Sequence, residues 1–232
     1  MIEVRPFAKL GHEDHGWLDA RHHFSFAGYQ DRDRMGWGRI RVWNDDTIAA
    51  HTGFNPHPHN DMEIITFVRS GAITHEDSLG NRGRTAAGDV QVMSAGTGIV
   101  HGEYNREDVS TTLFQIWIRP DRAGEKPSWG QREFPRDDRS GRWVVLASGE
   151  PDKDDALPIR AEAKVLAAKL AKGDVVTYDA APWRFQYLVA PVGRVRINGH
   201  EAEPRDGIAV TGEETITLEA LDDAEVVMVD AR

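Results

Sequence analysis

Two short segments of the chain each place a pair of metal-ligating residues two positions apart. The first segment contains His57 and His59, and the second contains His101 and Glu103. Side chains two residues apart in an extended chain point to the same face, so each pair can present its two ligand groups together. Two such pairs on neighbouring strands supply three imidazoles and one carboxylate. That ligand set suits one divalent transition metal, and Fe(II), Mn, Co, Ni, Cu and Zn all accept it.

The residues around these pairs favour an extended backbone. Pro56 and Pro58 fix φ on either side of His57 and remove two backbone donors, which stiffens the segment. Gly102 leaves room between the two members of the second pair. Nine of the ten histidines lie within the first 101 residues, so the sequence predicts a single site in the first half of the chain.

Glu63 competes with Glu103 for the fourth ligand position. It lies four residues beyond His59, at the start of an apolar run. The spacing alone does not choose between the two carboxylates. A carboxylate near a barrel mouth can also support a metal site by accepting a hydrogen bond from a ligand histidine. Both glutamates therefore remain candidates at this point.

The other histidines of the first half are interpreted as lying outside the site. His51 and His75 fall near predicted turns, where we expect solvent-exposed side chains. Four more lie among aromatic residues of the N-terminal segment and are interpreted mainly as packing residues: His12, His15, His22 and His23.

The elements that must position the ligands are predicted to be strands. Short apolar runs are separated by Gly, Asn, Asp and Pro turns, a pattern typical of a β-sandwich or barrel. A run at 164–170 could be helical by composition, and we favour a strand because Gly173-Asp174 and a further apolar run follow it. The predicted strands are 39–43, 63–68, 72–75, 89–93, 111–118, 143–146, 164–170 and 175–178.

A faint internal repeat predicts two domains of one type. The stretch from Asp121 to Gly141 is rich in charge, Pro and Gly and is interpreted as an interdomain linker. On either side of it, residues 67–90 and 187–210 both read as strand, small-residue turn, strand, turn, strand. We therefore expect an N-terminal domain over 1–125 and a C-terminal domain over 126–232.

Composition limits the classes of function. The 232 residues carry a formal net charge of −10, which argues against a direct nucleic-acid partner or an anionic membrane. There are no cysteines, which excludes disulfides, thiolate metal ligands and cysteine nucleophiles. No apolar run is long enough for a signal peptide or a membrane span, so a cytoplasmic protein is expected.

The candidate ligands lie in segments that resemble cupin motifs. The run from Asn55 to Gly71 resembles the first cupin motif, with its His-x-His, its downstream Glu63 and its closing glycine. The run from Gly88 to Asn105 resembles the second motif. More specifically, the block from His75 to Asn105 is similar to pirin, and residues 11–29 resemble the bacterial pirin-like quercetinases.

The resemblance implies an all-β bicupin, in which two cupin barrels of the jelly-roll type pack together. It implies that the N-terminal barrel binds one divalent metal, Fe(II) first among the candidates. It selects Glu103 over Glu63 as the carboxylate ligand beside His57, His59 and His101. It also implies a second barrel without metal ligands, which agrees with the absence of His-x-His after residue 101.

The resemblance further implies an activity like that of quercetin 2,3-dioxygenase, also described as a flavonol 2,4-dioxygenase. Such an enzyme opens the central ring of a flavonol with O2 and releases carbon monoxide. Glu103 is the first candidate for the base that takes the 3-hydroxyl proton, and Glu63 is the second. Candidates for an apolar substrate pocket are Phe24, Phe26, Phe54, Phe67, Met93 and Phe114.

Two alternatives stay open beside the dioxygenase. One is a metal- or redox-responsive regulatory protein that binds a partner protein. The other is cupin chemistry on a different substrate. A pocket mouth that admits a ligand of flavonol size would favour an enzyme over a regulator.

Overall fold

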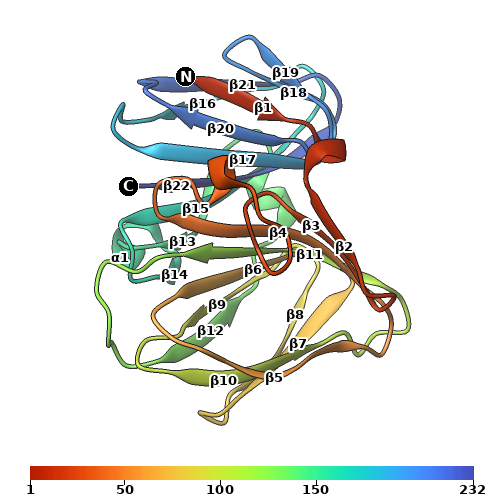
Figure 1. The fold of residues 1–232 in the computed structure, drawn as a ribbon. Coiled ribbons are helices and arrows are strands. Elements are labelled where there is room, and N and C mark those ends of the chain that lie inside the picture. The colour runs from red at the N-terminus through yellow and green to blue at the C-terminus, as the bar shows by residue number, and fades with distance from the viewer.

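The computed structural model describes residues 1–232 and consists almost entirely of β-strands arranged as two barrels (Figure 1). Each barrel combines a seven-stranded sheet with a four-stranded sheet. The prediction of an all-β bicupin is confirmed. No helix in the structure has the length and apolar character needed to cross a membrane.

The N-terminal barrel takes its strands from the first 132 residues. They are β2 Gly11–Asp14, β3 Leu18–His22, β4 Ile40–Ile48, β5 Gly53–His59, β6 Glu63–Ser70, β7 Ala72–Asp77, β8 Arg82–Ala86, β9 Val90–Ser94, β10 Ile99–Tyr104, β11 Thr111–Ile118 and β12 Ser128–Arg132. The larger sheet has the order β12-β9-β6-β11-β4-β3-β2, and the smaller has the order β5-β10-β7-β8.

The C-terminal barrel combines the first strand of the chain with all strands after β12. They are β1 Ile2–Arg5, β13 Val144–Ser148, β14 Leu157–Pro158, β15 Ala163–Leu170, β16 Val175–Asp179, β17 Phe185–Val192, β18 Val195–Ile197, β19 His200–Ala202, β20 Gly207–Thr211, β21 Thr215–Ala220 and β22 Ala224–Ala231. The sheet orders are β1-β20-β17-β22-β15-β13-β14 and β16-β21-β18-β19. The helical elements are short: α1 Pro151–Asp154, η1 Phe7–Lys9, η2 Arg32–Arg34 and η3 Arg136–Arg139.

The two barrels repeat one strand order. The order β9-β6-β11-β4 in the first barrel corresponds to β20-β17-β22-β15 in the second, and β5-β10-β7-β8 corresponds to β16-β21-β18-β19. Every strand from β4 to β11 therefore has a counterpart eleven strands later. The predicted internal repeat is confirmed, and the ambiguous run at 164–170 is a strand, β15.

Part of the predicted linker is a strand. β12 lies within the stretch from Asp121 to Gly141 and pairs antiparallel with β9, so the interpretation of that stretch as a linker alone is wrong. The indole of Trp129 on β12 packs against an apolar cluster of the first barrel, which draws this segment onto the sheet. Conversely, β1 pairs with β20 of the second barrel. Each barrel thus receives one strand from across residue 125, and the domain division there stays a prediction.

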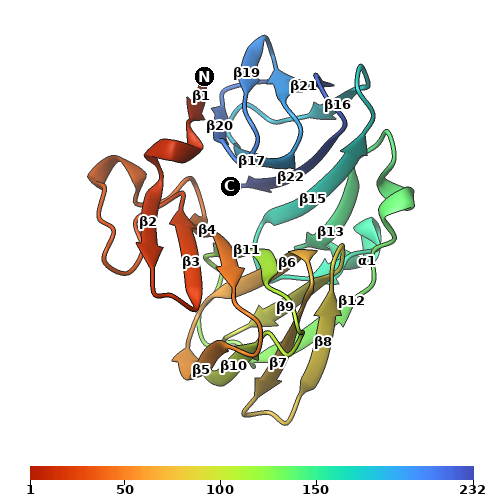
Figure 2. The ribbon, with the colours of Figure 1, turned by 90° about the vertical axis from the view of Figure 1, so that its right-hand side faces the viewer.

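The largest apolar cluster lies between the barrels, where the two seven-stranded sheets face each other (Figure 2). Trp43 packs there against Phe114 of the first barrel and Tyr187 of the second, with ring centroids 5.4 Å and 5.5 Å away. The alternation of side chains along a strand sends every second residue of β6, β9 and β11 into this interface. The alternate residues of these three strands point to the other face of the sheet and line the interior of the first barrel.

The interiors of the two barrels differ in character. The second is filled by 18 buried apolar residues, and its strands β16 and β21, the counterparts of β5 and β10, contain no histidine. The first holds two smaller apolar clusters with buried polar groups beside them: Thr66, Gln91, Gln115, His75, His101 and Glu103. A polar interior of this kind marks the first barrel as the place for chemistry.

Candidate metal centre

The two predicted ligand pairs lie on adjacent strands. β5 and β10 pair antiparallel with His57 opposite His101, and the register shifts between His101 and Glu103. β5 is an edge strand, which is where a sheet tolerates proline because the missing donors face no neighbour. Pro56 and Pro58 therefore stiffen β5 without breaking a ladder.

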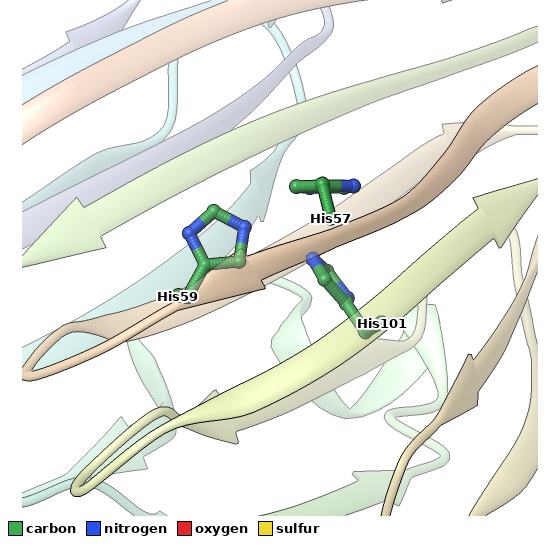
Figure 3. A group of neighbouring side chains, drawn as sticks. All are labelled: His57, His59 and His101. Carbon is green, nitrogen blue, oxygen red and sulfur yellow. The ribbon is translucent and has the colours of Figure 1, made fainter.

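Three of the four predicted ligands converge. The possible ligand atoms of His57, His59 and His101 lie within 4.8 Å of one another. Their ring centroids are 4.5 to 4.9 Å apart. Figure 3 shows a nitrogen of His101 pointing into the space between His57 and His59. This spacing suits three nitrogen ligands of one ion.

The free nitrogens of these rings also fit a metal. His57 Nδ1 donates to the Asn55 carbonyl oxygen at 2.7 Å, which leaves Nε2 with its lone pair. His101 Nε2 is buried and has no hydrogen-bond partner. Burial, and then the neighbouring histidines, lower the pKa of His59 to about 4 and that of His101 to about 3. Both rings are therefore neutral near pH 7, as metal ligation requires.

These shifts predict how the metal-free protein responds to acid. Unfolded histidines take up protons near pH 6.5, whereas folded His59 and His101 do so only near about 4 and about 3. Between those limits the unfolded state binds more protons, so the free energy of unfolding should fall as the pH drops from about 6.5 to about 4. Denaturant unfolding across this range measures the slope. His59→Asn should make it shallower, and an unchanged slope in that variant would contradict the assignment.

Glu103 is held by a row of polar side chains on the opposite sheet. Its Oε1 accepts from Gln91 Nε2 at 2.6 Å and from Thr66 Oγ1 at 3.3 Å, and its Oε2 accepts from Gln115 Nε2 at 2.6 Å. Thr66 lies opposite both Gln91 and Gln115 in the strand register, so the three donors stand side by side. These contacts fix the carboxylate inside the barrel, next to His101.

His75 lies beside the site, and the prediction that it is solvent-exposed is wrong. Its side chain is fully buried, and its possible ligand atom lies within 4.8 Å of those of His101 and Glu103. His75 lies on β7 itself, before the turn. Side chains alternate between the two faces of a strand, and His75 is at a position that points into the barrel. His51 is exposed, as predicted.

Glu63 is buried away from the three histidines. Its Oε2 accepts from Ser94 Oγ at 2.6 Å and from the backbone N–H of Arg160 at 3.1 Å. Burial raises its pKa, and these hydrogen bonds act in the opposite direction. It does not line the cavity described next, so the structure gives it no contact with that space.

A cavity of about 830 Å³ opens beside the histidines, within the size range of small-molecule sites. His57, His59 and Glu103 line it, together with residues from β3, β4 and the loops around them. Of the six apolar pocket candidates only Phe26 and Phe54 line it. The other four are buried core residues, three of them in the interface between the barrels: Phe24, Phe67, Met93 and Phe114.

Several residues of the cavity were missed in the sequence. His15 and His22, interpreted as packing residues, line it, as do Asn44 and Asp46 of β4. Burial, then the charges of Asp45 and Glu103, raise the pKa of Asp46 well above its usual value. The sequence did contain a signal, since four consecutive polar residues in the middle of β4, 44–47, are unusual for a central strand.

Comparison with known proteins relates this chain to a family. The family model described as Pirin matches residues 3–118, and the model described as Quercetinase C-terminal cupin domain matches residues 144–231. A pirin-like protein of Caulobacter vibrioides is 59% identical over 231 residues, covering 100% of both chains. A quercetin 2,3-dioxygenase of Escherichia coli is 41% identical over 232 residues, covering 99% of this chain and 98% of the relative.

A solved structure is similar over the same extent. The crystal structure of the bacterial pirin YhhW from Escherichia coli in complex with nickel(II) has a TM-score of 0.94 and 39% sequence identity to this chain. The match covers 100% of this chain and 99% of that one.

Proposed function

The chain belongs to the pirin family, and from this premise we propose that it is a metal-dependent dioxygenase of the quercetin 2,3-dioxygenase type. It would open the central ring of a flavonol with O2 and release carbon monoxide. One observation carries the proposal: three histidines converge, with the fixed Glu103 carboxylate beside one of them, next to a cavity that is large enough for a flat aromatic ligand.

We propose that His57, His59, His101 and Glu103 hold one divalent metal, Fe(II) in the first instance. The free Nε2 atoms of His57 and His101 support this, as does the nickel(II) complex of the similar bacterial pirin. When bound, the metal would act as a Lewis acid and lower the pKa of the flavonol 3-hydroxyl.

The cavity wall supports a flat aromatic substrate. Trp17 and Phe54 line it with ring centroids 5.1 Å apart, and Phe26 and Trp117 line it with centroids 5.4 Å apart, both pairs edge to face. Aromatic side chains with polar groups placed among them are typical of the walls of small-molecule sites. The space available favours the enzyme over the regulatory alternative, which needs no such cavity.

Glu103 is our candidate for the base. A carboxylate oxygen offers two lone pairs, and Oε2 of Glu103 carries one donor, Gln115, whereas Oε1 carries two. Oε2 therefore keeps one free lone pair, which can bind the metal or accept the hydroxyl proton but not both at once. To act as the base, Glu103 would have to give up its contact with the metal. Glu63 has no contact with the cavity, so we leave it out of this role.

A turnover assay tests the proposal. Protein loaded with Fe(II) under anaerobic conditions and then exposed to quercetin and air should consume the flavonol absorbance and release carbon monoxide in equal amounts. Metal-free protein, as the control, should do neither. Fully metal-loaded protein that leaves quercetin unchanged would rule out the flavonol reaction.

A further inference from the structure

A buried hydrogen-bonded chain leads from Asp77 through His75 to His101. β7 pairs with β10 so that Asp77 lies opposite His101 and His75 lies opposite Glu103. The side chains of His75 and Asp77 have no exposed surface. His75 is not needed as a ligand by the proposed function, yet it lies against one of the ligands, so its role requires a separate explanation.

The position of the proton on His75 follows from the partners of Asp77. Oδ1 of Asp77 accepts from the backbone N–H groups of Leu79 and Asn81 at 2.9 and 3.1 Å. Oδ2 accepts from Asn81 Nδ2 at 2.9 Å and contacts His75 Nε2 at 2.8 Å. A carboxylate that receives donors on both oxygens can only accept from His75. His75 therefore carries a proton on Nε2, and in the neutral ring Nδ1 is left with the lone pair.

The position of the proton on His101 follows from the same reasoning. His75 Nδ1 faces His101 Nδ1 at 3.4 Å. Because the first of these atoms is an acceptor, the second must carry the proton and donate it. His101 Nε2 then keeps its lone pair, and this is the buried nitrogen without a partner.

Aromatic packing holds the ring of His75 in place, between Asp77 and His101. The indole of Trp129 stacks on His75 with centroids 4.8 Å apart and planes at 10°. Trp129 comes from β12, the strand that joins the first barrel from beyond residue 125. Stacking on Trp129 thus constrains the ring plane of His75, and the hydrogen bond to Asp77 constrains its tautomer.

We propose that His75, oriented by Asp77, is a positioning residue that keeps the proton of His101 on Nδ1 and leaves Nε2 free for the metal. The inference rests on the metal site proposed above. Residues that orient a ligand histidine contribute about ten- to hundredfold to metal affinity, so a residue that does not touch the ion would control how tightly it binds.

Asp77→Asn tests the relay at one atom. The amide oxygen of the new side chain can still accept from the backbone N–H groups of Leu79 and Asn81. Its NH2 group then faces His75 Nε2 and no longer accepts from Asn81 Nδ2. The proton of His75 must then move to Nδ1, and that of His101 to Nε2. Long-range ¹H–¹⁵N NMR of the metal-free full chain should show protonated Nδ1 on His101 in the wild type and protonated Nε2 in the variant.

Nickel(II) titration supplies the second measurement. Asp77→Asn and His75→Leu should each weaken nickel(II) binding by about ten- to hundredfold. His75→Gln should retain most of the affinity, because its amide can accept from His101 and donate to Asp77. Asp19→Asn is the matched control, since it breaks an exposed His12–Asp19 pair of 3.3 Å far from the relay and should change nothing.

The outcomes separate this inference from the proposed function. Wild-type protein that binds no nickel(II) contradicts the metal site itself, while the NMR result still decides the tautomer. Protonated Nε2 on wild-type His101 would overturn the inference. So would equal losses of affinity in His75→Gln and His75→Leu, which would indicate a packing role, or undiminished affinity in folded Asp77→Asn.

Discussion

Replacing His101 with alanine should abolish stoichiometric metal binding. His101 contributes the buried Nε2 that has no protein partner, and it lies next to His57, His59 and the carboxylate of Glu103. Losing a ligand atom should cost more than the roughly ten- to hundredfold that is typical of residues that only orient a ligand. Elemental analysis after dialysis against limiting Fe(II) or nickel(II) measures the effect.

The matched control for this variant is His51→Ala. His51 lines the mouth of the same cavity, but its ring is exposed and pairs with Asp108 at 3.1 Å. It should keep its metal and its thermal stability. Full occupancy in folded His101→Ala protein would show that the ion binds elsewhere.

Glu103→Gln should lower flavonol turnover per bound metal ion by about a hundred- to ten-thousandfold, the range that proton transfer by a placed side chain contributes. A glutamine cannot take the hydroxyl proton. Its NH2 group would also face the amide donor of either Gln91 or Gln115, both of which donate to the carboxylate at 2.6 Å. Two donors facing each other in a buried site cost free energy of about 1–3 kcal/mol, so the variant should also unfold at a lower temperature.

Glu63→Gln is the control that separates the two glutamates. Glu63 is equally buried but accepts from Ser94 and Arg160 outside the cavity. Turnover at saturating quercetin should therefore stay near the wild-type rate. If Glu63→Gln abolished turnover and Glu103→Gln preserved it, the assignment of the base would be reversed.

The histidine cluster could be predicted because it depends on local geometry. In an extended strand the two-residue period alone brings His57 and His59 to one face. The same period predicts that His101 and Glu103 share a face. The all-β architecture followed from the same periodicity. For β15 composition alone was ambiguous, and the turn at Gly173 with a further apolar run after it favoured the strand that the structure shows.

The surroundings of Glu103 could not be predicted in this way. Its three donors come from β6, β9 and β11, and only the register of these strands brings Thr66, Gln91 and Gln115 together. The spacing of these residues in the sequence does not predict how β6, β9 and β11 are aligned with one another. The polar residues at inward positions were visible in the sequence, but their common target was not.

The burial of His75 illustrates a second limit. A position near a turn suggests exposure, yet the residue lies two positions before the end of β7, and its side chain points into the barrel. Trp129, which covers it, comes from the stretch interpreted as a linker. The unpredicted pairing of β12 with β9, which places Trp129 over His75, therefore contributes to both errors.

We propose that one metal binds in the first barrel between β5 and β10. Anomalous diffraction from a metal-loaded crystal, measured at the absorption edge of the ion, tests it most directly. We expect a single peak about 2.1 Å from Nε2 of His57, His59 and His101, with a Glu103 oxygen at a similar distance. A peak on the other side of His101, between His75 and Glu103, or one in the second barrel, would contradict it.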